Sequence, residues 1–103
     1  MFRIHINDAE EATTFMLEGR LVGPWVSELE NCWQRALAAE PRRSVLVNLQ
    51  EVSFVDSAGI ALLTRMCRHG VRLMSTGIMM NAIVEEIENK AANPDLGDKG
   101  TAT

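Results

Sequence analysis

Basic residues are not in excess in this sequence, which has 10 Lys and Arg against 14 Asp and Glu and a formal net charge of -4. Domains that bind nucleic acid normally present a basic patch. The densest basic stretches here are only Arg42-Arg43 and the Arg65…Arg68 pair. Nucleic acid is therefore excluded as a partner.

Long apolar runs are missing as well. No run approaches the roughly 18 apolar residues that a membrane-spanning helix needs. The N-terminal stretch MFRIHIN also lacks the apolar block of a signal peptide. We therefore expect a cytoplasmic protein that does not insert directly into a membrane.

Cysteine is scarce, with only Cys32 and Cys67 present. Two cysteines within apolar helical patterns do not make a disulfide framework, and no spacing here matches a zinc site. A free thiol in such a pattern behaves as a small hydrophobic side chain. We expect two reduced core cysteines, and neither a metal nor another cofactor.

The chain has 103 residues, 47% of them hydrophobic, which suits one domain with its own core. The apolar patterning ends near residue 90, so we expect the domain to span residues 1–90. Residues 91–103, AANPDLGDKGTAT, are small, polar and rich in glycine. Such a composition predicts a disordered tail.

Alternation of apolar and polar residues predicts two antiparallel strands at the start of the chain, around residues 2–6 and 14–21. Gly23-Pro24 breaks the second strand, and proline suits the first turn of a helix. The helix that follows carries Trp25 and Trp33 on one apolar stripe. We expect both tryptophans to be core residues.

After Pro41, the apolar run SVLVNL predicts a central strand covered on both faces. A helix from Ser57 to Arg68, a short strand VRLMS and a third helix over Ile78–Lys90 follow. The third helix is expected to direct four side chains inward: Met79, Ala82, Ile83 and Ile87. The order β-β-α-β-α-β-α predicts an α/β fold, with a small mixed, mostly parallel sheet packed against helices.

Ser57 lies in FVDSAGIALL, between a strand and a helix, and this position suggests three roles. The first is a catalytic nucleophile, as in the G-x-S-x-G turn of hydrolases, but Val55 stands where that turn has its first glycine. The general base would be His5, in the polar register of the first strand, or His69, about 15 Å away along the helix. These positions argue against a hydrolase.

The second role is a helix cap, because the side-chain oxygen of Asp56 or Ser57 could accept a hydrogen bond from a free backbone N–H. Gly59 would let the turn approach closely. The third role is a phosphate acceptor, since the start of a helix favours negative charge. A phosphate there would add about two negative charges without unfolding the protein. The pattern permits both roles and does not choose between them.

The segments LEGRL, VLVNL and VSFVDSAGIALL, in this order over residues 2–88, resemble the STAS domains typified by anti-sigma factor antagonists. The resemblance implies that Ser57, between Asp56 and Gly59, accepts phosphate from an anti-sigma factor that is a serine kinase. It also implies that the unphosphorylated form binds this partner and releases a sigma factor, and that phosphorylation prevents binding. By this resemblance we expect a substrate and binding module that is not an enzyme.

Two segments differ from the antagonist pattern. Many antagonists have Ser or Thr where this chain has Ala58, and Gly-Glu-Leu-Asp where it has Gly-Arg-Leu-Val at residues 19–22. The resemblance places the end of that segment, Arg20 and Val22, at the partner-facing surface. It also implies that loop support and partner contact come from Asp56, Ala58, Gly59 and Ile60.

DSAGIALL is also similar to a segment in small STAS subunits of lipid-transport ABC complexes. Those subunits bind the cytosolic ATPase subunit as structural partners. An alternative to the phosphorylation switch is therefore a scaffold protein in which Ser57 remains unmodified.

In the helix that begins at Ser57, Leu62 and Met66 widen the apolar arc to roughly half of the circumference, more than one buried face needs. They either pack on the third helix, which we favour, or form an apolar patch beside Ser57 for a partner. The sequence also leaves open whether Met79 and Met80 serve the core or a docking surface.

Overall fold

The computed structural model describes residues 2–92 and contains four strands and three helices. Their order confirms the predicted β-β-α-β-α-β-α arrangement. The elements are β1 (Phe2–Asp8), β2 (Ala12–Leu21), α1 (Pro24–Ala39), β3 (Ser44–Val55), α2 (Ser57–Arg68), β4 (Arg72–Met74) and α3 (Ile78–Ala92).

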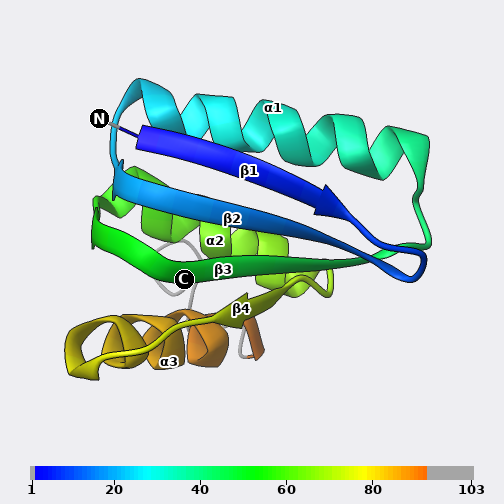
Figure 1. The fold of residues 1–103 in the computed structure, drawn as a ribbon. Coiled ribbons are helices and arrows are strands. Elements are labelled where there is room, and N and C mark those ends of the chain that lie inside the picture. Colours follow the sequence, from blue (N-terminus) through cyan, green and yellow to red (C-terminus); the bar gives the residue numbers. More distant parts are fainter. Residues whose placement is uncertain (1, 93–103) are drawn as a thin grey trace, which may run out of the picture.

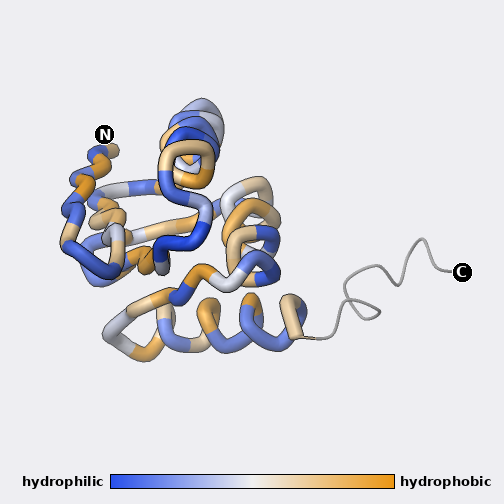
Figure 2. The backbone as a smooth tube through the Cα atoms, turned by 90° about the vertical axis from the view of Figure 1, so that its right-hand side faces the viewer, coloured by the Kyte–Doolittle hydropathy of each residue, from blue (hydrophilic) through white to orange (hydrophobic). Residues whose placement is uncertain are grey.

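The four strands form one mixed sheet in the order β1-β2-β3-β4 (Figure 1). β1 and β2 are antiparallel because a tight turn joins them, whereas β2 pairs with β3 and β3 with β4 in parallel. Parallel neighbours need a crossover connection, and α1 and α2 supply these two crossovers. α1 and α2 cover one face of the sheet, and α3 packs against α2 (Figure 2).

The core lies between this sheet and the helices. Alternate residues of β2 and β3 point into it, as the period of a strand requires. Phe15, Leu17 and Leu21 are fully buried, as is Val47 on β3. Trp33 of α1 is 2% exposed, which confirms its predicted place in the core.

Three predictions about the core are wrong. Trp25 is 39% exposed, because it lies in the first turn of α1 and stacks on Phe2 at 5.9 Å between ring centroids. On α3, Met79 is 79% exposed and Ala82 is also exposed. The residues that α3 buries are Met80, Val84 and Ile87, because α3 packs on α2 through that side of the helix.

The boundaries at the C-terminal end differ slightly from those expected. α3 continues to Ala92, two residues past the predicted end of this helix at Lys90. Ala91 and Ala92, which were expected in the tail, are therefore helical, and the rest of the expected tail, residues 93–103, lies outside the described residues. Within residues 2–92, no helix is both long enough and apolar enough to cross a membrane.

Candidate functional site

Three loops meet at one end of the molecule, which we call the helix-start pole. They are residues 22–23 after β2, residue 56 after β3 and residues 75–77 after β4, and each leads into a helix (Figure 1, left). The carboxyl ends of parallel strands are where α/β proteins usually place their binding residues. Ser57 lies at this pole, as the first residue of α2.

Asp56 is the N-cap of α2. Its backbone is extended, with φ -83° and ψ -179°, and its Oδ1 accepts a hydrogen bond of 2.8 Å from the N–H of Gly59. Its Oδ2 accepts a second bond, 3.0 Å, from the N–H of Gly23, and its own N–H donates to the Leu21 carbonyl at 3.1 Å. One carboxylate therefore both caps the helix and holds the loop after β2.

These hydrogen bonds hold the pKa of Asp56 below its ordinary value, with the N–H of Gly59 contributing most and that of Gly23 next. A carboxyl whose pKa is lowered by folding stabilises the protein above its unfolded-state pKa of about 3.9, and the stabilisation disappears as the pH falls through the folded-state pKa. We expect wild type to be more stable than Asp56→Asn near neutral pH and the difference to close in acid. Urea unfolding midpoints of the two proteins, measured from neutral to acidic pH, test this prediction. A difference in stability that does not change with pH would contradict it.

Ser57 is exposed, and its hydroxyl has no hydrogen-bond partner among residues 2–92. Asp56 has taken the capping role, so the Ser57 side chain is not needed for the fold. Neither histidine serves it as a base: His5 lies 3.8 Å from Glu18 on the hairpin, and His69 caps the opposite end of α2.

Gly59 is buried, and its immediate surroundings within the protein leave no room for a side chain. A Cβ atom at this position would lie 2.7 Å from Val55 Cγ1 and 3.1 Å from the Leu21 carbonyl oxygen. The close approach at Gly59 is therefore between α2 and the ends of β2 and β3. Of its neighbours, Ala58 is exposed and Ile60 is half-buried.

The loop residues singled out in the sequence also lie at the helix-start pole. Arg20 pairs with Phe54 across β2 and β3, and its guanidinium carbon lies 5.2 Å from the centroid of the Phe54 ring. Val22 is half-buried and precedes Gly23, which Asp56 holds. The fold thus brings Arg20 and Val22 to the same end as Asp56 and Ser57.

The apolar patch considered for α2 does not exist. Leu62 and Met66 are both 0% exposed. They belong to the core because α2 is covered by the sheet on one side and by α3 on another. A helix enclosed in this way buries about half of its circumference, which accounts for the wide apolar arc.

The exposed apolar residues of the pole come from other segments, and of these only Met79 was considered from the sequence as part of a docking surface. Phe54 is 46% exposed, Ile78 90% and Met79 79%. The signal was the run Ile78-Met79-Met80 at the start of a helix: successive helical residues point about 100° apart, so one face cannot bury all three.

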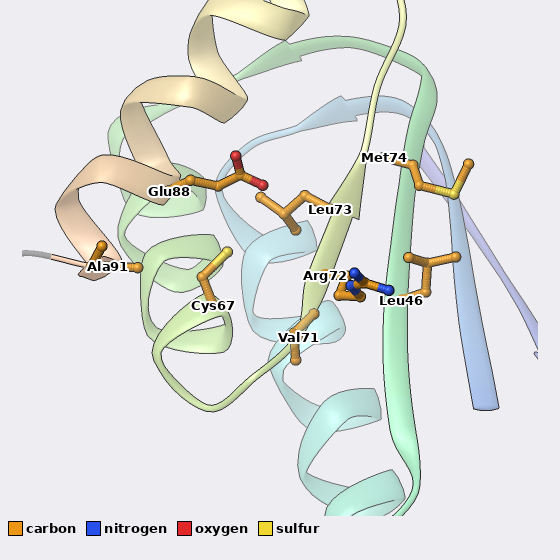
Figure 3. Close-up of a pocket in the computed structure, with 9 residues that line it drawn as sticks. Leu46, Cys67, Val71, Arg72, Leu73, Met74, Glu88 and Ala91 are labelled. Atoms are coloured by element: carbon orange, nitrogen blue, oxygen red, sulfur yellow. The ribbon is translucent and has the colours of Figure 1, made fainter. Parts of the chain in front are cut away.

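Another hollow of the described residues lies elsewhere (Figure 3), with a volume of about 710 Å³. Its lining includes Leu46, Leu73 and Cys67, near the end of α2 about 15 Å along the helix from Ser57. Burial raises the pKa of Cys67 to about 11, so its thiol stays protonated at neutral pH. Within the described residues, no group of three or more His, Cys, Asp or Glu could hold a metal ion.

Comparison with known families agrees with this architecture. The family model of the STAS domain matches residues 3–93. The chain belongs to the STAS domain family. Comparison with curated proteins finds no match for this STAS domain.

Solved structures similar to this STAS domain include two antagonists. An anti-sigma factor antagonist from Mycobacterium paratuberculosis has a TM-score of 0.74 at 15% identity, over 91% of this chain and 84% of that one. The anti-sigma factor antagonist SpoIIAA in its unphosphorylated form has a TM-score of 0.66 at 19% identity, over 82% of each chain. At such identities the likeness establishes the fold: a four-stranded mixed sheet with three helices, as in SpoIIAA.

Proposed function

We propose that this STAS domain is an anti-sigma factor antagonist in a bacterial cytoplasm and that a partner serine kinase switches it by phosphorylating Ser57. The unphosphorylated form binds the partner through the helix-start pole, and the phosphorylated form does not. The domain is then a substrate and a binding module, with no catalysis of its own. The observation that carries the proposal is the exposed Ser57 hydroxyl, left without a structural role because Asp56 caps α2.

The surroundings of Ser57 tolerate a phosphate. The first turn of α2 itself contains no acidic side chain, the neighbouring Asp56 carboxylate is held by the N–H groups of Gly59 and Gly23, and the start of a helix carries the positive end of its dipole. A phosphate would add roughly two negative charges at the surface that meets the partner. Phosphorylation would therefore change what the pole binds while leaving the core intact.

Intact-mass measurement of the protein from its native cells, with mapping of the modified residue, tests this proposal. We expect one phosphate in a fraction that changes with growth condition, lost in Ser57→Ala and kept in Ser53→Ala, which removes another exposed serine nearby. Because the Ser57 hydroxyl is unpartnered, Ser57→Ala should shift the free energy of unfolding by no more than about 0.5 kcal/mol. A phosphate on another residue, or none under any condition, would reject the switch.

The second candidate is a scaffold that binds the ATPase subunit of an ABC complex without a switch. The exposed apolar side chains of Phe54, Ile78 and Met79 favour it, because apolar contact needs no modification to be used. A scaffold would co-purify with the ATPase subunit while Ser57 stays unmodified. Replacing Ser57 by Asp would then leave the complex unchanged, whereas the switch predicts that it dissociates.

A further inference from the structure

An apolar groove of about 490 Å³ lies between the end of β3 and the first turn of α3. Its lining includes Val52, Phe54, Ile78, Met79 and Ile83. None of its ten lining residues is charged, whereas the hollow beside β4 contains Arg72 and Glu88. The groove is therefore suited to an apolar occupant rather than to an anion or a cation.

Two side chains that line this groove belong to the first turn of α3 and are exposed to solvent. Ile78 and Met79 are the most exposed large apolar residues of the described chain, at 90% and 79%. They cannot turn inward, because Met80, Val84 and Ile87 already fix which side of α3 faces the core. Exposed apolar side chains grouped in this way mark interaction sites, and Met and aromatic residues are enriched in protein interfaces.

The groove lies at the same end of the molecule as the proposed phosphorylation site. Its lining includes Val55, and only Asp56 separates Val55 from Ser57. A protein that reaches the Ser57 hydroxyl therefore approaches the same end of the molecule as Ile78 and Met79. Binding energy in protein interfaces is concentrated where a large side chain fills such a pocket.

We propose that this groove holds a large apolar or aromatic side chain of the kinase that phosphorylates Ser57, and that this contact anchors the kinase during phosphorylation. The inference rests on the proposed function. The remainder of the chain is a poor occupant: residues 93–103 follow Ala92, roughly 20 Å from Ile78 along α3. They contain a single large apolar residue, Leu96.

The groove is tested first without the kinase, using indole as a probe for an aromatic side chain and the methionine methyl groups as reporters in NMR. We expect indole to shift the Met79 methyl signal most strongly. Met16 and Met74 serve as controls, since they are 40% and 39% exposed on β2 and β4. Equal shifts at all three methionines, or none, would overturn the groove as a binding site.

The second measurement is the fraction of Ser57 phosphorylated in the native cells. We expect the ratio of phosphorylated to unphosphorylated Ser57 to be about tenfold lower in the Ile78→Ser/Met79→Ser protein than in wild type, the effect of roughly 1.4 kcal/mol of lost binding. The control Ile6→Ser/Met16→Ser removes the same residue types from the β1–β2 hairpin and should match wild type. Unfolding midpoints of both proteins check that the effect is not a loss of folding.

The outcomes separate the two proposals. Normal phosphorylation of the Ile78→Ser/Met79→Ser protein would overturn the anchor and leave the switch at Ser57 intact. Equal losses in both double variants would also overturn the anchor, because the effect would not be specific to the groove. Absence of phosphate from wild type would reject the switch, and with it the kinase as the occupant, even where indole binds.

Discussion

Truncation of Leu62 to alanine is expected to lower the free energy of unfolding by about 2–5 kcal/mol. Leu62 is 0% exposed in α2, the helix enclosed between the sheet and α3. The truncation removes apolar contacts and leaves a cavity that the packed elements around it cannot fill. Since domains of this size are stable by only about 5–15 kcal/mol, this loss is a substantial fraction of the total stability. Urea unfolding followed by circular dichroism measures the loss.

The matched control is Ile78→Ala, which removes a similar volume from a side chain that is 90% exposed. We expect a change within about 0.5 kcal/mol for this variant. Comparing Leu62→Ala with Ile78→Ala also distinguishes core from surface positions in α2 and α3, the two helices whose apolar residues could not be placed from the sequence. A small effect at Leu62, equal to that at Ile78, would show that α2 is not enclosed as described.

The second large effect is expected for Gly59→Ala. Alanine is favoured over glycine inside a helix by about 1 kcal/mol, but the added Cβ would lie 2.7 Å from Val55 Cγ1 and 3.1 Å from the Leu21 carbonyl oxygen. Valine has few rotamers and the carbonyl belongs to the backbone, so neither moves easily. Overpacking of this kind costs about 1–3 kcal/mol. We expect the clash to dominate and the variant to be destabilised.

Ala61→Gly gives the control for Gly59→Ala, because Ala61 is an exposed position of the same helix. Glycine there should destabilise by about 1 kcal/mol through propensity alone. In the same unfolding assay, Gly59→Ala and Ala61→Gly would then both destabilise the protein, the first through a steric clash and the second through lower helix propensity. A stabilised Gly59→Ala protein would show that α2 does not approach Leu21 and Val55 so closely.

Much of the fold could be predicted because local patterns and the tertiary structure agree. Alternation predicted the buried side of β2, and Pro24 and Gly70 marked the start of α1 and the end of α2. The third helix could not be oriented in this way. Its consecutive apolar residues Ile78, Met79 and Met80 lie on different faces of the helix, so the pattern does not show which face is buried. That depends on how α3 packs against α2, a contact between separate segments.

The same distinction applies to the site. The position of Ser57 at a helix start was evident from the sequence, and the structure places it there. Whether Asp56 or Ser57 caps that helix depends on backbone angles and on the N–H of Gly23, which is 33 residues away from Asp56 in the chain. The residues next to Ser57 in the sequence contain no information about such a contact. Only the structure therefore shows that the Ser57 hydroxyl is left without a capping role.

The hydrogen bonds of Asp56 also determine when the site comes into existence. They join the loop after β2 to the start of α2. This requires β2 and β3 to be paired, although α1 lies between the two strands in the sequence. Contacts between distant segments form late, after the entropy of closing the chain between them has been overcome. A partly folded chain therefore lacks the arranged serine loop, and the proposed kinase would act only on folded molecules.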